Sequence, residues 1–209
     1  MNRILTFVTT LAFVAIFAMP AQAQLQGDSR FSLQGGFTLA DLSGDDVASG
    51  TTSSKSGFLA GVGFNYFFAQ NWSISIEGNW LAGLGAKEAD GDAETKLSYF
   101  SFPVTLDFAF PLGENEKTWL GLQGGINAMM RLTCNVNDGG LSSQDVDCKD
   151  DTESVSWAVP LGAGIGFKAA DAAVVYLKAR YQLGLSSVVK DEDVKINWWE
   201  FILGVGFAP

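Results

Sequence analysis

Apolar and polar residues alternate along most of this chain with a period of two. In the stretch WSISIEGNWLAG (Trp72–Gly83), tryptophan and isoleucine share one face of an extended chain, while serine, asparagine and Glu77 share the other. Successive side chains of a β-strand point to opposite faces, so this alternation predicts a strand with one apolar and one polar face. The pattern recurs in further segments, and no helical period competes with it after residue 23. The predicted strands are Arg30–Leu42, Gly57–Phe68, Trp72–Leu84, Thr95–Phe110, Thr118–Leu132, Ser154–Phe167, Ala172–Ser187 and Val194–Phe207.

The connections between these segments alternate between short and long. Each segment exceeds the about 9–11 residues that a tilted strand needs to cross a bilayer. The longer, polar connections are expected at about 43–56, 85–94, 133–153 and 188–193. Outer-membrane barrels combine short periplasmic turns with longer outer loops. The sequence therefore predicts an all-β protein, an eight-stranded antiparallel up-and-down transmembrane barrel with both termini in the periplasm.

The apolar faces are so rich in aromatic residues that they decide the orientation of the strands. Eight such faces would overfill the narrow interior of an eight-stranded barrel. We therefore expect Ile76 to point towards lipid and Glu77 to point into the lumen. Aromatic residues near the strand ends are expected to form interfacial girdles. These are Tyr66, Trp72, Trp119, Trp157, Tyr181 and Trp199.

The polar faces carry charges that would meet inside the barrel. Three acids and three bases are involved, so the interior can be neutral, and buried charges must be paired or hydrated. Arg180 and Glu200 are expected to lie opposite each other as a bidentate pair. Two interpretations stay open: a gated or selective pore, and an ion-pair network that fills a lumen too narrow to conduct. The predicted network comprises Glu77, Asp107, Arg131, Lys178, Arg180 and Glu200.

Composition narrows the classes of function. The chain has 23 acidic and 13 basic residues, a net charge of −10, which argues against nucleic acid as a partner. It contains no histidine, which removes Ser-His-Asp catalysis and histidine-ligated metals. We therefore expect no enzymatic activity, no cofactor and no metal site. The acidic loops are interpreted as a solvated surface, although weak Ca²⁺ binding by DGDAE is an alternative.

The first 23 residues have the pattern of a secretory signal peptide. A basic start at Arg3 precedes an apolar run and the small residues of an Ala-x-Ala cleavage site, which predicts a signal peptide over 1–23 and a mature barrel over 24–209. A membrane anchor is the alternative interpretation. An exported chain meets an oxidising compartment, so Cys134 and Cys148 are expected to form a disulfide within the longest loop.

Four segments resemble a known family. YFSFPVTLDFAF (Tyr99–Phe110) and ARYQLGLSSV (Ala179–Val188), together with GLQGGINAMM and VPLGAGIGF, resemble strands of the small PorT-like, porin-family barrels of Bacteroidota. The resemblance implies an outer-membrane protein of a Gram-negative bacterium that the β-barrel assembly machinery inserts. It also implies, for some members, an accessory role in protein secretion.

The expected function is that of a structural or surface-interaction protein with a polar, largely filled lumen. A small diffusion channel is the main alternative, and an accessory component of secretion is another. A soluble secreted barrel that binds an apolar ligand inside is a further alternative. The expected partners are outer-membrane lipid, the assembly machinery and a surface or secretion partner that the residues do not identify. The protein is expected to be a monomer.

Overall fold

The structure is a computed structural model, and it describes residues 28–44, 52–88, 94–112, 117–137, 146–148, 150–170 and 172–208. The predicted signal peptide, residues 1–23, lies outside the described residues, as do parts of three of the predicted loops. No helix in the described ranges is long and apolar enough to cross a membrane.

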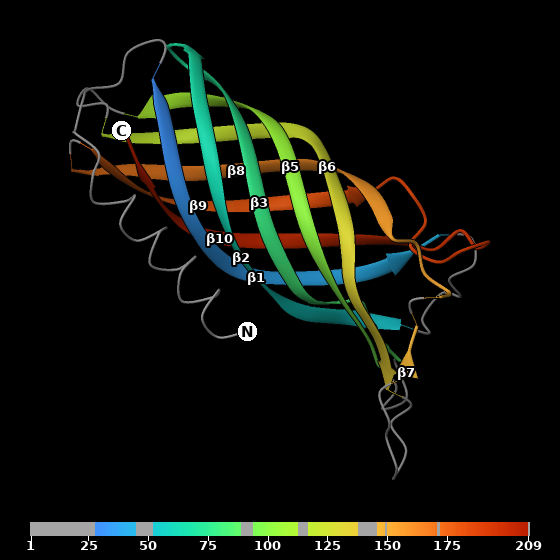
Figure 1. The fold of residues 1–209 in the computed structure, drawn as a ribbon. Helices are drawn as coiled ribbons and strands as arrows, with labels where there is room; N and C mark the ends of the chain where they lie inside the picture. The colour runs from blue at the N-terminus through green and yellow to red at the C-terminus, as the bar shows by residue number, and fades with distance from the viewer. Residues whose placement is uncertain are drawn as a thin grey trace, which may run out of the picture.

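The long strands form one closed antiparallel barrel (Figure 1). Closure is made by the first and last strands, in which Phe31 pairs with Phe207 on one side and with Phe64 on the other. Each further neighbour in the barrel follows along the chain, so no strand edge is left open in the barrel wall. The strands are β1 Ser29–Ser43, β2 Thr52–Ala69, β3 Trp72–Leu84, β5 Glu94–Leu112, β6 Thr118–Asn137, β8 Val155–Ala170, β9 Ala173–Gly184 and β10 Lys195–Phe207.

Two short strands extend the barrel at the end opposite the termini, which we call the loop side; the other end is the turn side. Strand β4 (Ala86–Glu88) pairs with both β2 and β5, and β7 (Val146–Asp147) pairs with the end of β6. The 20-residue β6 and β5, which pairs with it as far as Asn137, extend past most of the other strands in Figure 1. Cys134 and Cys148 form the expected disulfide, with their Cα atoms 5.2 Å apart, and join β6 to the segment after β7.

The two faces of the wall differ as the sequence predicts. The side chain of Ile76 is 51% exposed on the outside, whereas Glu77 is 3% exposed inside. Aromatic side chains cover the outer surface in contact with one another across strands, including Phe37 stacked on Phe201 at 4.8 Å. This is the arrangement in which the apolar faces meet lipid and the polar groups face the lumen.

Strand boundaries follow the prediction most closely on the turn side. Strand β3 has the predicted bounds Trp72–Leu84. Strands β2 and β6 are longer on the loop side, because β4 and β7 supply partners for backbone groups that isolated loops would leave to water, whereas β9 ends at Gly184, before the predicted Ser187. The predicted loops at 43–56, 85–94 and 133–153 therefore include residues that the structure places in strands.

A β-bulge changes which residues of β3 point into the lumen near the loop side. The pairing of β3 with β5 shifts between Ala82 and Leu84, and Gly83 adopts a positive φ of 78°. Glycine reaches that conformation without the penalty that a Cβ brings. The consequence is that both Leu81 and Leu84 are fully buried, although strict alternation would separate them.

Candidate functional site: the barrel interior

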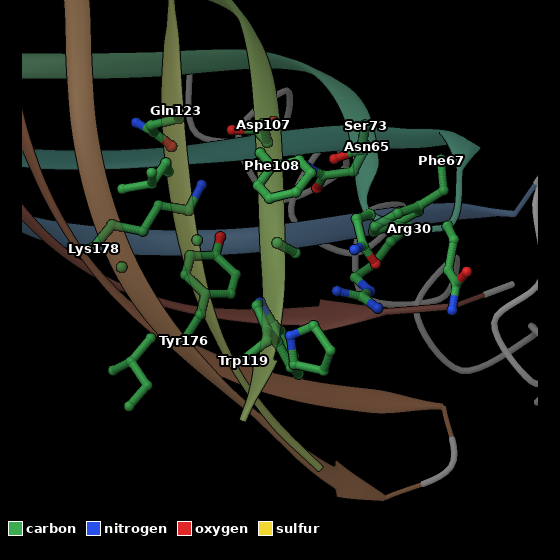
Figure 2. Close-up of a pocket in the computed structure, with 18 of the residues that line it drawn as sticks. Arg30, Asn65, Phe67, Ser73, Asp107, Phe108, Trp119, Gln123, Tyr176 and Lys178 are labelled. Carbon is green, nitrogen blue, oxygen red and sulfur yellow. The ribbon is translucent and has the colours of Figure 1, made fainter. Parts of the chain in front are cut away.

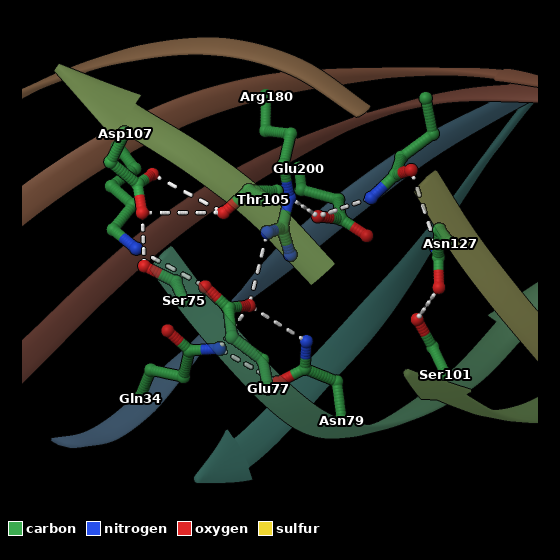
Figure 3. A network of polar contacts seen from close by, with 12 residues as sticks. Gln34, Ser75, Glu77, Asn79, Ser101, Thr105, Asp107, Asn127, Arg180 and Glu200 are labelled. Carbon is green, nitrogen blue, oxygen red and sulfur yellow. Dashed lines mark hydrogen bonds and ion pairs between the residues drawn. The ribbon is translucent and has the colours of Figure 1, made fainter. Parts of the chain in front are cut away.

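A buried ion-pair network crosses the middle of the lumen (Figure 3). The Nε atom of Arg180 on β9 lies 2.6 Å from Oε2 of Glu200 on β10, and its Nη1 lies 3.0 Å from Oε2 of Glu77 on β3. Lys178 Nζ lies 3.2 Å from the other oxygen of Glu77. Arg180 and Glu200 are fully buried. One guanidinium thus bridges two carboxylates on different sides of the barrel, instead of making the predicted bidentate pair with Glu200.

Neutral polar side chains extend this network to further strands. Gln34 on β1 donates to Glu77 at 2.8 Å and accepts from Tyr176 at 3.0 Å. Gln182 donates to Glu200 at 3.2 Å and accepts from Asn127 on β6 at 3.2 Å. Buried carboxylates are tolerated where such hydrogen bonds occupy their lone pairs. The lumen at this level is therefore closed by paired groups from several strands.

The interior on the loop side of the network is filled mainly by apolar side chains. Trp198 marks the boundary, because its ring is buried while its indole N–H donates to Glu200 at 2.7 Å. Apolar side chains from several strands fill the barrel beyond it. They include Leu81, Leu84, Leu97, Tyr99, Met129, Val188, Val194 and Ile196.

The interior on the turn side contains a cavity of about 470 Å³ (Figure 2). Arg30, Trp119, Tyr176 and Lys178 line it, and its outer end reaches Gln70 and Asn71 in the turn between β2 and β3. The guanidinium of Arg30 lies 5.1 Å from the Phe67 ring centre and 5.6 Å from that of Trp119. Such distances allow cation–π attraction on both sides of the cation.

Glycines on neighbouring strands make room for the large side chains of this cavity. A Cβ at Gly166 would come within 2.2 Å of the Trp119 ring, and one at Gly204 within 2.1 Å of the Tyr176 ring. The glycine-rich stretches of β8 and β10 thus leave the space against which these rings pack. The side chains occupy defined places because any larger residue opposite would displace them.

The structure brings together four of the six residues predicted for the ion-pair network: Glu77, Lys178, Arg180 and Glu200. Of the other two, Asp107 lies beside the network, near the charges of Lys178 and Glu77, without a direct ion pair to it, whereas Arg131 lies apart from it. Asp107 lines the turn-side cavity and accepts hydrogen bonds from the hydroxyls of Ser75 and Thr105. Arg131 lies on the loop side, opposite Tyr99 in the pairing of β5 with β6, and donates to Thr152. The tilt and stagger of the strands separate these levels, and the face of a strand does not reveal them.

Five of the six predicted girdle residues lie on the outer face. Tyr66, Trp72, Trp157 and Trp199 are all at least 39% exposed, and the Tyr181 ring lies 5.0 Å from that of Trp199. Trp119 is a correction to that prediction. It shares the inner face of β6 with Gln123, half-buried against Gly166 and Arg30, because the glycine opposite leaves space inside for an indole.

Several interior residues were missed because aromatic and aliphatic side chains were assigned to lipid as a class. Trp198 has the same parity as Glu200, and Tyr176 the same parity as Lys178. Position within the alternation was therefore a usable signal for both rings. It would not have found Leu84, whose direction depends on the bulge at Gly83.

Comparison with known proteins agrees with this architecture. Residues 21–190 match the family described as "Outer membrane protein beta-barrel domain". The chain belongs to this family. Membership places the protein in the outer membrane, whereas the PorT-like subgroup is not distinguished by the match. A search of curated protein sequences finds no match.

Solved outer-membrane barrels share the fold of this family member. OprG from Pseudomonas aeruginosa is 15% identical with a TM-score of 0.51, over 90% of this chain and 99% of that one. Neisserial surface protein A is 15% identical with a TM-score of 0.52, over 85% and 96%. Outer membrane protein W of E. coli is 16% identical with a TM-score of 0.52, over 88% and 99%. Identities this low show the shared barrel only.

Proposed function

We propose that the protein is a non-conducting outer-membrane barrel that acts as a structural or surface-interaction protein through its loop side. The termini and the short turns face the periplasm, and the long connections face outward, as in other barrels with this asymmetry. The observation that carries the proposal is the fully buried Arg180, which bridges Glu77 and Glu200 across the lumen.

Two successive barriers support a closed lumen. The ion-pair network occupies the middle, and an apolar layer that includes Leu81, Met129 and Trp198 follows on the loop side. A small hydrated ion would have to break buried ion pairs and then pass an interior filled mainly by apolar side chains. Each step costs several kcal/mol, roughly the penalty for unpairing or desolvating a charge. Eight-stranded barrels have interiors that side chains fill, which agrees with this arrangement.

The loop-side extension supports a role in surface contact. Strand β6 has 20 residues and β5 has 19, whereas β9 has 12. The additional length exceeds the about 9–11 residues that a strand needs to span a bilayer, so these strands carry paired backbone beyond the membrane. The disulfide fastens this extension. A rigid outward projection is a suitable platform for contact with another surface.

Single-channel recording in planar bilayers tests the closed lumen. The purified wild-type protein should give no stable conductance step, while a conducting porin reconstituted in the same way should. Stable, reproducible conductance of the wild-type protein would overturn the proposal in favour of a small diffusion channel. Conductance that appears only after Arg180→Ala combined with Trp198→Ala would support it, because those changes remove parts of both barriers.

The expected partners belong to the same proposal. They are outer-membrane lipid around a monomeric barrel, the β-barrel assembly machinery during insertion, and a contact partner on the loop side, with no catalytic role. The resemblance to PorT-like strands adds an accessory role in protein secretion as an extension of the proposal. Deletion of the gene with unchanged export of secreted proteins would remove that extension.

A further inference from the structure

Arg30 is a buried arginine whose hydrogen-bonding capacity the barrel leaves unused. Its side chain lines the turn-side cavity and is only 8% exposed. No residue that the structure describes accepts a hydrogen bond from its guanidinium or forms an ion pair with it, and Asp28 and Tyr176 act on its charge only through space. A guanidinium has five N–H donors, and buried donors without acceptors are costly. The cavity therefore contains a cation whose donors are all available to a molecule inside it.

Two aromatic rings hold the guanidinium in place (Figure 2). Its central carbon lies 5.1 Å from the centre of the Phe67 ring and 5.6 Å from that of Trp119. Cation–π attraction stabilises the charge without supplying an oxygen or nitrogen acceptor. None of the guanidinium nitrogens is sealed from solvent, since each keeps accessible surface. An acceptor inside the cavity can therefore reach them.

A glycine on β10 makes room for the hydrocarbon part of Arg30. A Cβ at Gly206 would come within 2.6 Å of Cδ of Arg30 and within 2.9 Å of a methyl carbon of Val174. The side chain thus packs against bare backbone, and its guanidinium lies at Phe67 and Trp119. A side chain that is held in place before binding loses less entropy when a ligand arrives. The contact point for a ligand is therefore formed in advance.

The charges around the cavity favour an anion with a single negative charge. Lys178, the second cation of the wall, is paired with Glu77, so the attraction for an anion comes mainly from Arg30. Asp107 also lines the cavity, and its carboxylate would repel a second negative charge on a ligand. The guanidinium fork matches a planar carboxylate through two parallel hydrogen bonds. A monocarboxylate therefore fits these charges better than phosphate or a dicarboxylate.

The size and the outer wall of the cavity limit the rest of the ligand. Its volume of about 470 Å³ lies within the range of about 300–1,000 Å³ that small-molecule sites occupy. The ion-pair network closes its inner side, and its outer end extends to the turn between β2 and β3. Ala69, Ala109 and Pro111 line that end with side chains that have no donor or acceptor. A short aliphatic body suits such walls, because it leaves no polar group unpaired.

We propose that the turn-side cavity binds a small monocarboxylate with a short aliphatic body. The carboxylate accepts hydrogen bonds from the Arg30 guanidinium, and the body lies towards Ala109 and Pro111. The site opens to the periplasm in the orientation of the proposed function, so it is distinct from any contact on the loop side. A conducting wild-type barrel would overturn the proposed function but not this site, because the carboxylate binds on the turn side of the ion-pair network.

Nuclear magnetic resonance of the full barrel in phospholipid nanodiscs tests this contact, with isotope-labelled arginine and sodium butanoate as the probe. The guanidinium N–H resonances of Arg30, assigned by their loss in Arg30→Lys, should shift and saturate as butanoate replaces chloride at constant ionic strength. Those of Arg131, which donates to Thr152 on the loop side, should not shift. Absence of a saturable shift at Arg30, as expected for a side chain that only water contacts, would overturn the proposal.

Two further probes test the chemistry of the ligand in the same titration. Butanamide has the shape of butanoate without its charge and should bind at least about tenfold more weakly, because hydrogen bonds to a charged acceptor are stronger. Doubly charged inorganic phosphate should also bind more weakly than butanoate, because Asp107 repels its second charge. Equal binding of butanamide would overturn the role of charge, and tighter binding of phosphate would overturn the choice of a monocarboxylate.

Two matched arginine substitutions locate the site by calorimetric titration with butanoate, with empty nanodiscs as the blank. Arg30→Met keeps an unbranched side chain beside the rings of Phe67 and Trp119 but removes every donor, so saturable binding should be lost. The barrel should still fold, because the change removes donors that no described residue accepts. Arg131→Met on the loop side should leave the affinity unchanged. Equal affinities of the two variants would place butanoate elsewhere and overturn the proposal.

Arg30→Lys separates the positive charge of this residue from the geometry of its donors. Lysine keeps the charge but lacks the planar fork, so the affinity for butanoate should fall by about tenfold in the same calorimetric titration. Unchanged affinity would show that the carboxylate does not engage the fork and would overturn the assigned binding mode.

Discussion

The loop-side and turn-side halves of this barrel have the same wall but different interiors. On the loop side, Leu81, Leu84 and Trp198 are packed with at most 1% of their surface exposed. On the turn side, Arg30 and Lys178 line an open cavity. The buried pair of Arg180 and Glu200 divides the two regions. The comparison shows that a period of two can specify a barrel while leaving each level of its lumen free to become packed or hollow.

A substitution in the ion-pair network that divides the two halves should have the largest effect on stability. Arg180→Met would leave Glu77 and Glu200 as buried carboxylates without their bridging cation. We expect the free energy of unfolding in lipid vesicles, measured by urea titration with tryptophan fluorescence, to fall by about 3–5 kcal/mol.

A double variant tests whether the loss of stability comes from the unpaired carboxylates or from the missing Arg180 side chain itself. Adding Glu200→Gln to Arg180→Met removes one stranded charge and leaves Glu77 with Lys178. The double variant should recover more than half of the lost free energy. Equal destabilisation of the single and double variants would contradict the view that unpaired charge is the cause.

Substitutions in the packed, loop-side half should have the next largest effect on stability, because they remove buried side chains that fill the interior. Leu81→Ala would open a space in a fully buried position, and the free energy of unfolding should fall by about 3 kcal/mol. Leu161, which is 53% exposed on the outer face, is the matched control. Leu161→Ala should cost only about 1 kcal/mol, because lipid refills the space. Similar losses for both variants would mean that the loop-side interior is not tightly packed.

In the hollow, turn-side half, substitutions at two glycines of the wall should have different effects on stability. Gly166→Ala would press a methyl group into the Trp119 ring, and the free energy of unfolding should fall by about 2 kcal/mol. Gly121→Ala places its methyl group in open cavity and should stay within about 0.5 kcal/mol of the wild type. The same urea titration measures both. A neutral Gly166→Ala would show that the indole is not held against that glycine.

Much of this arrangement could be predicted, and the failures have specific physical causes. The bounds of β3, the direction of Ile76 and Glu77, and the disulfide all follow from local patterns and from the compartment. Arg131 was misplaced because strand tilt sets the height of a residue in the lumen, and pairing along one strand does not show it. Trp119 was misplaced because aromatic residues were assigned to lipid as a class, although it shares the inward face of β6 with Gln123; Gly166 on another strand provides the space for its ring.

The sequence by itself determined the environment of this protein, since alternation, loop lengths and the aromatic outer faces have one consistent solution, an outer-membrane barrel. The tertiary structure alone decided how the interior is divided. Arg180 became a bridge between two acids only when β3, β9 and β10 closed around it. The bulge at Gly83 turned Leu84 inward to fill the loop side, and glycines on β8 and β10 made room for the rings of the cavity. These contacts join residues far apart in the chain, so no local pattern contains them.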